Sequence, residues 1–488
     1  MKPSVLLAYA ILVLAAIAAL ASPGLAFIYL ISAMPIPAIM HFAPIPNDRM
    51  KGFLVLTGLA IFAIFFIRPV FLLHFPYLFK FDRLYIPDLD ELSRGLMLAG
   101  FLSTIFLLAV QFGLQTRRKH RRRGPKVRQE GWLEVRLFDK PMFSIFVVVL
   151  AVLFLWLIFF TGYAEKNSGQ TQYLRAILPF DLLFPIVMVM VWRHKPGTAG
   201  GAFWIGILAL LCAATIFRGS KSALFLFLIG LLGLFMYTRG NRAWPVRRVM
   251  QTLFVTLIPL PLSVQIANFF RWGANIDLPN KYYTSDIVAP FNLYLLDVIT
   301  KRLNGFDGQI VAQTLVNTFN INVFSWTNAL ASALGKLLPG VALGGESMGV
   351  AIGRFVNLVD ADVDYGGSLG LYGASILMNG PIGNLVFLLV LGFAVGRLAR
   401  LALALKPGPE QALVFLIAVQ IAAHWLISGN FDILISDFVV LLVQILFYGL
   451  LFGTARRIRS QPLARGRVFS MPAGPRATRP GRQARLGR

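Results

Sequence analysis

The chain has 488 residues, of which 57% are hydrophobic and only 14% are charged, and its mean hydropathy is +0.72. A soluble core does not need that much apolar surface, so the composition excludes an ordinary soluble globular protein. The net charge of +25 would suit a nucleic-acid-binding protein. We expect no nucleic-acid partner, however, because the basic residues border apolar segments and are better explained by membrane topology.

Apolar runs long enough to cross a bilayer, roughly 17 to 25 residues each, recur about twelve times along the chain. The sequence therefore predicts an all-α polytopic membrane protein with about 12 transmembrane helices. The predicted spans cover residues 4–21, 25–42, 53–73, 95–115, 142–161, 173–192, 201–217, 222–238, 249–268, 371–396, 411–428 and 433–454.

Lysine and arginine gather in every second gap between these spans, which is the positive-inside pattern. The run Arg117 to Lys140 and the tail after Arg456 are inside gaps, whereas Asp88 and Glu91 fall in an outside gap. This pattern predicts a multi-pass membrane protein with both termini in the cytoplasm. The basic blocks beside spans also predict contact with anionic membrane lipids, at about 1 kcal/mol for each base near the surface.

The spacing of the spans predicts four parts. Residues 1–268 hold transmembrane helices 1–9, residues 269–370 form one large periplasmic loop, and residues 371–455 hold helices 10–12. Residues 456–488 form an Arg-rich cytoplasmic tail whose composition predicts disorder. Long loops usually carry function, so the loop is the expected place for a site. Helical spacing of apolar residues predicts short helices at 287–299 and 310–319, lying on or dipping into the outer membrane surface.

The turn between the seventh and eighth predicted spans combines two cations with small residues: Arg218, Gly219, Ser220 and Lys221. A helix that begins after such a turn directs free backbone N–H groups and its positive end outward. Arg218 and Lys221 are therefore predicted to bind a phosphate or a diphosphate. The alternative is a pair of cations that snorkel at the membrane edge.

Further basic residues follow in the long loop, among them Arg271, Arg302 and Arg354. We predict that these arginines bind an anionic substrate, with solvated surface as the alternative for each one. Asp307 lies between glycines just after Arg302, and it is predicted to be a general base for a sugar hydroxyl. The alternative for Asp307 is a helix N-cap.

His424 lies well inside the eleventh predicted span and could be a proton acceptor or a phosphate ligand. A hydrogen bond between packed helices is the alternative. Asp181 and Asp437 also lie in or near spans, and such carboxylates can mark proton paths, so they keep a transporter hypothesis open.

The sequence predicts no metal. The lone cysteine, Cys212, cannot form an intrachain disulfide or a thiolate cluster. The run Asp360 to Asp364 starts like a calcium loop, but Tyr365 and Leu371 stand where that loop needs its glycine and its glutamate. An irregular cation site is the alternative.

Three segments resemble bacterial O-antigen and exopolysaccharide repeat-unit polymerases of the Wzy type. They are Phe217 to Leu224, Arg302 to Gly308, and Tyr365 to Gly370 with its continuation to Asn384. The likeness covers roughly residues 210 to 400. It implies a membrane bundle similar to the glycosyltransferases of the C fold class, which use lipid donors, need no nucleotide, and here need no cofactor.

The resemblance also implies an enzyme of the bacterial inner (plasma) membrane that joins undecaprenyl-diphosphate-linked oligosaccharide repeats at the periplasmic face. Its expected partners are this lipid-linked substrate, a chain-length regulator and a flippase. Arginines that bind the diphosphate are a feature of the family, and Arg218, Lys221, Arg271 and Arg302 match it best. Two other functions stay open: an O-antigen ligase, which differs only in its acceptor, and a lipid-linked oligosaccharide flippase.

Overall fold

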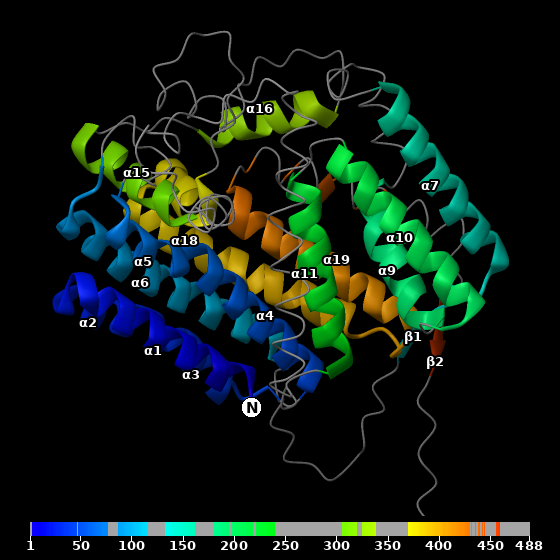
Figure 1. Cartoon of the computed structure of the whole chain (residues 1–488), viewed down its shortest axis with the longest axis horizontal. Coiled ribbons are helices and arrows are strands. Elements are labelled where there is room, and N and C mark those ends of the chain that lie inside the picture. Colours follow the sequence, from blue (N-terminus) through cyan, green and yellow to red (C-terminus); the bar gives the residue numbers. More distant parts are fainter. Residues whose placement is uncertain are drawn as a thin grey trace, which may run out of the picture.

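A computed structural model describes residues 2–45, 47–76, 86–115, 132–161, 180–194, 197–217, 221–239, 305–319, 325–337, 369–429 and 455–458, and isolated positions between 431 and 444. The described part is mostly helical, and seven of its helical segments are long and apolar enough to cross a membrane. The chain is therefore an α-helical membrane protein, as its composition predicts (Figure 1).

The N-terminal helices are α1 Pro3–Ala21, α2 Pro23–Ala33, α3 Pro35–Phe42, α4 Asp48–Phe65, α5 Ile67–His74 and α6 Leu89–Leu114. Three of them begin with proline, which the first helical turn tolerates because its N–H groups have no partner in the helix. Helix α6 begins with a capping box, in which Asp88 accepts from the Glu91 N–H at 2.7 Å and Glu91 accepts from the Asp88 N–H at 3.2 Å.

The later helices are α7 Pro141–Thr161, α9 Phe180–His194, α10 Ala199–Phe217, α11 Lys221–Arg239, α15 Gly305–Phe319, α16 Trp326–Leu337, α18 Gly370–Ala402 and α19 Pro409–Ser428. Strands β1 Trp132–Val135 and β2 Ala455–Ile458 pair antiparallel, with Glu134 opposite Arg456. The first residues of the predicted tail thus belong to a strand, and the rest of that tail lies outside the described residues.

Six of the candidate spans match the predicted spans 4–21, 25–42, 53–73, 95–115, 142–161 and 411–428, and the seventh, Ile382–Ala402, overlaps the predicted span 371–396 in part. Three shorter apolar helices coincide with the predictions at 173–192, 201–217 and 222–238. The predicted span 249–268 lies outside the described residues, and only isolated positions of 433–454 are described. The tenth predicted span begins too early, because α18 is broken at Gly380 and the apolar span starts at Ile382.

Helices α6 and α18 pack closely through small residues. A Cβ on Gly392 would lie 2.8 Å from the Ala109 Cβ, and a Cβ on Gly113 would lie 2.9 Å from the Gly396 Cα. Gly392 and Gly396 are four residues apart, so they share one helix face. Small residues at this spacing let helix backbones approach, which favours association inside a membrane.

Helix α15 is buried in the bundle. Its Phe306, Ile310 and Ala312 are buried, and it contacts α4, α6, α18 and α19. The predicted helix at 310–319 is present, but it does not lie on the surface, because other helices enclose it. That it dips into the outer side of the membrane stays a prediction. Apolar residues at helical spacing are equally expected on a buried helix, and the sequence does not distinguish the two. The predicted helix at 287–299 lies outside the described residues.

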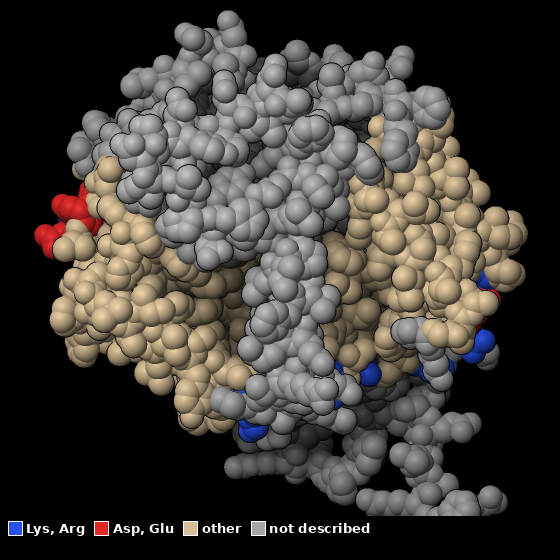
Figure 2. Space-filling model, in the orientation of Figure 1, with Lys and Arg blue, Asp and Glu red and all other residues tan. Residues whose placement is uncertain are grey.

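One end of the bundle carries most of the described positive charge, and we call it the basic end: Arg49, Lys51, Arg193 and Arg400. There the Arg49 Nη1 donates to the Gln411 Oε1 at 2.7 Å, which ties the start of α4 to the start of α19. Figure 2 shows Lys and Arg along the lower and lower right edges of the view, the larger group of Asp and Glu at its left edge, and a smaller acidic group beside the cations at the right. Most of the basic residues seen in this view therefore lie on one side, as expected for a chain with one basic side.

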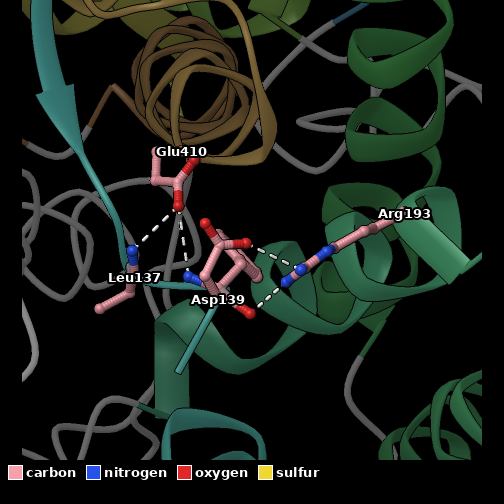
Figure 3. A network of polar contacts seen from close by, with 5 residues as sticks. Leu137, Asp139, Arg193 and Glu410 are labelled. Carbon is pink, nitrogen blue, oxygen red and sulfur yellow. Dashed lines mark hydrogen bonds and ion pairs between the residues drawn. The ribbon is translucent and has the colours of Figure 1, made fainter. Parts of the chain in front are cut away.

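A polar network at the basic end joins α9, α19 and the segment between β1 and α7 (Figure 3). The Glu410 carboxylate accepts from the backbone N–H groups of Leu137 at 2.9 Å and Phe138 at 3.2 Å. Arg193 donates to the Phe138 carbonyl and, at 2.9 Å, to the Asp139 carboxylate. Glu410 thereby fixes the approach to α7 against the start of α19.

Replacing Glu410 by Ala is expected to destabilise the protein by about 1.5–3 kcal/mol, the range for hydrogen bonds to a charged group. The matched control is Asp139→Ala, because this carboxylate is 61% exposed and its ion pair with Arg193 should contribute less than about 1 kcal/mol. Unfolding free energies measured in detergent micelles compare the two variants. Equal losses would show that Glu410 does not fix this segment.

Candidate functional site

A buried ion pair joins α5 and α15. The Arg68 Nε lies 2.8 Å from the Asp307 Oδ1 and 2.9 Å from its Oδ2, and the two side chains are 1% and 0% exposed. Arg68 belongs to the candidate span Asp48–His74. An arginine at mid-membrane costs about 2.5–3.5 kcal/mol on insertion scales, so its burial requires compensation. The Asp307 carboxylate contributes to that compensation.

The sequence around Arg68 explains how its side chain reaches α15. Pro69 has no N–H to donate to the carbonyl of Phe65, four residues before it, and this interrupts the helix. Helix α4 ends at Phe65 and α5 begins at Ile67, with Phe66 between them at φ −119° and ψ −18°. The interruption directs α5, with Arg68 in its first turn, along a new axis.

The start of α15 meets the start of α18 through glycines, at what we call the glycine junction: Gly305, Gly308, Gly370, Gly373 and Gly429. A Cβ on Gly370 would lie 2.7 Å from the Gly305 Cα, and one on Gly373 would lie 2.6 Å from the Gly308 carbonyl oxygen. No real Cβ approaches backbone so closely, so these positions require glycine.

Helix α19 ends at the same junction. Gly429 is its left-handed C-cap, with φ +62°, and a Cβ there would collide with the Gly370 carbonyl oxygen. Gly370 is itself left-handed, with φ +67°. Three helix ends therefore meet at the junction, at the opposite end of α4 and α19 from the basic end.

The junction brings together two of the segments that carry the family resemblance. The described parts of these segments are Gly305 to Gly308 and Leu369 to Asn384, and Gly308 packs directly on the Leu369 backbone. Their separation along the chain is about sixty residues, a spacing that no local interaction explains. Asp307 lies inside the first of these segments, so the ion pair and the junction form one site.

Gln309, two residues after Asp307, places a polar side chain between α15 and α6. Its side chain is fully buried, and its Nε2 donates to the Gly95 carbonyl at 3.0 Å. Within the described part of the chain, its Oε1 has no hydrogen-bond partner. A buried acceptor without a donor is costly, so this oxygen is a place where a hydroxyl or a water would be stabilised.

The structure places two of the predicted site residues. Asp307 is the third residue of α15, so the N-cap alternative is wrong. Its role as a general base stays a prediction, because the carboxylate is enclosed and held by Arg68 in this conformation. His424 lies in α19, five residues before Gly429, and is partly buried. Its predicted roles also stay predictions.

The predicted anion-binding residues are not placed. Arg218, Arg271, Arg302 and Arg354 lie outside the described residues, and of Lys221 only its position at the start of α11 is described. The described residues contain no group of three or more His, Cys, Asp or Glu side chains that could hold a metal ion.

Sequence reasoning missed Arg68, although a signal was present. An arginine stands inside the predicted span 53–73, in the apolar run from Ile64 to Leu73. An ionisable residue within a span is by default a functional-site hypothesis with an acidic partner to be found. Asp307, 239 residues away, is that partner.

Comparison of the chain with protein-family models, with curated proteins and with solved structures finds no match in any of the three.

Proposed function

We propose that this chain polymerises undecaprenyl-diphosphate-linked oligosaccharide repeats at the periplasmic face of a bacterial inner membrane, with both termini in the cytoplasm. The supporting observation is the site at the glycine junction, where two of the segments on which the proposed resemblance rests meet beside a buried ion pair. The separation of charge between the two ends of the described bundle agrees with the proposed orientation.

The proposed reaction is a glycosyl transfer from a lipid diphosphate. A hydroxyl of the incoming lipid-linked repeat attacks the anomeric carbon of the growing glycan, and the bond from that carbon to the diphosphate breaks. The leaving diphosphate develops negative charge, which fixed cations stabilise without a proton. Arg218, Lys221, Arg271, Arg302 and Arg354 are the residues proposed for this role.

The proton of the attacking hydroxyl needs an acceptor, and Asp307 is the first candidate and His424 the second. Arg68 holds both oxygens of Asp307, so it is a positioning residue for this carboxylate. For Asp307 to accept the proton, its carboxylate must exchange Arg68 for the substrate hydroxyl.

Deleting the gene tests the class of the activity, with lipid-linked and surface glycans analysed by gel and mass spectrometry. A polymerase is expected to leave single repeats on the lipid at the periplasmic face. Long chains retained on the lipid would indicate a ligase. Repeats held at the cytoplasmic face would indicate a flippase, and the proposed site roles would then be wrong.

Complementing the deletion with Arg218→Ala tests the proposed diphosphate site. Loss of one such donor is expected to lower polymerisation about 100- to 1,000-fold. Arg193→Ala is the matched control, because this arginine lies at the basic end in a partly exposed ion pair and should leave polymerisation unchanged. Equal activity of the two variants would contradict the role of Arg218.

A further inference from the structure

The outer face of α16 is apolar and exposed. Trp326, Leu330 and Leu334, four residues apart, are 37%, 47% and 46% exposed. The residues that α16 buries are small: Ala329 and Ala333, with Ser332 beside them. A helix at a water-facing surface has the opposite arrangement, with its large apolar residues buried. Small residues inward and large apolar residues outward are the pattern of a helix that faces lipid.

Trp326 ties this helix to α18. Its indole Nε1 donates to the Asn379 Oδ1 at 2.8 Å, and its ring lies 5.5 Å from the Phe387 ring and 5.4 Å from the Phe431 ring. Asn379 directly precedes the break at Gly380, and the candidate span Ile382–Ala402 begins three residues after Asn379. Trp326 therefore lies where a membrane span begins, the level at which tryptophan is enriched in membrane proteins.

The apolar face of α16 adjoins a second exposed apolar face on α18. Ile382, Val386, Leu389 and Val390 are 80%, 59%, 48% and 63% exposed, and they share one side of the candidate span. In a membrane this side contacts acyl chains. Phe387, which contacts Trp326, lies on the flank of the same stripe, so the two apolar faces are continuous.

The length of α16 decides how it can meet the bilayer. Its 12 residues extend about 18 Å at 1.5 Å per residue, whereas a crossing needs about 20 residues. Figure 1 shows α16 across the top of the view, beyond the long helices of the bundle. An amphipathic helix of this kind lies in the interface plane with its apolar face among the acyl chains.

We propose that α16 is an interfacial membrane helix whose face of Trp326, Leu330 and Leu334 is inserted into the acyl-chain boundary of one leaflet. The partner is the lipid bilayer itself. Insertion fixes the depth of α16 and, through the Trp326–Asn379 hydrogen bond, ties the break in α18 to the membrane surface. The proposal does not depend on the glycan chemistry and stands or falls separately from it.

Spin labels on the full-length chain in lipid nanodiscs test this. Cys212 is the only cysteine, so Cys212→Ser gives a background in which Leu330→Cys is labelled alone. We expect the label at 330 to collide several-fold more with oxygen, which concentrates in acyl chains, than with a water-soluble nickel complex. Val386→Cys on α18 should behave in the same way, and Asn328→Cys, which is exposed and polar, should show the opposite preference.

Two results would overturn the proposal. A label at 330 that favours the nickel complex would place α16 in water, and a label that neither reagent reaches would mean that protein covers this face. Leu334→Cys repeats the measurement one turn further along the same face, so a single variant that fails to fold does not decide the outcome. A label at Val386→Cys that prefers oxygen to the nickel complex verifies that the span Ile382–Ala402 is still in the membrane of the labelled protein.

Discussion

Arg68→Gln is expected to destabilise the protein by about 3–5 kcal/mol, the range for removing one partner of a buried ion pair. The loss arises because the Asp307 carboxylate, which is fully buried, would keep its charge without the guanidinium that holds both its oxygens. Asp307→Asn should lower the unfolding free energy by a similar amount, because the buried Arg68 guanidinium would then lose the Asp307 charge. Denaturant titrations in detergent micelles measure the unfolding free energies.

The double variant Arg68→Met/Asp307→Leu separates stability from chemistry. Apolar residues that replace both members of a buried pair often restore stability, so this variant should unfold later than either single variant. If Asp307 accepts the proton, the stable double variant will still fail to lengthen glycans in cells. Recovered polymerisation would show that the pair has only a structural role. If Arg68→Gln had the same unfolding free energy as the unmodified protein, the expected destabilisation of this variant would be contradicted.

Gly308→Ala is expected to destabilise the protein by about 1–3 kcal/mol, the usual range for overpacking. A Cβ at this position would collide with the Leu369 backbone, which cannot move aside as a flexible side chain can. To admit the methyl group, α15 must separate from the start of α18, and the contact between the two resembling segments is lost. We therefore expect polymerisation to fall together with stability.

Gly206→Ala is the matched control for this substitution. Gly206 lies in α10, and a Cβ there would meet nothing within 4 Å. The same chemical change should therefore stabilise the protein there by about 0.5–1 kcal/mol, the usual gain for alanine over glycine within a helix. Opposite signs for the two variants in one denaturation assay would establish the close packing at the junction. Equal effects would show that the junction tolerates a side chain.

The positions of the candidate spans could be predicted from the sequence because apolar length is a local property. The break in α18 was harder to place, since Gly380 and the proline after it look like a kink inside a continuous span. Gly305 and Gly308 were interpreted as residues that open the backbone around Asp307. In the structure they allow two helix ends to touch, and which backbone approaches a glycine depends on tertiary packing.

The features of the site that could not be predicted from the sequence are contacts between residues far apart in the chain. Asp307 was selected as a functional residue for its polar neighbours, but its partner Arg68 lies in another predicted span, 239 residues away. Hydropathy locates both segments and contains no information on which helices pack together. The contact of Gly308 with Leu369 is hidden for the same reason, although both segments were singled out by their residues.

The order of the ion pair along the chain constrains how the protein is made. Arg68 is synthesised 239 residues before Asp307, which at about 5–20 residues per second corresponds to about 10–50 s. Throughout that interval the nascent third span contains Arg68 without the Asp307 carboxylate that it binds in the folded protein. Arg68 stands six residues before the end of α5, about 9 Å at 1.5 Å per residue, so its long side chain can reach the headgroup region meanwhile. The pair can therefore form only after Asp307 has been synthesised, and its formation requires α15 to lie against α5.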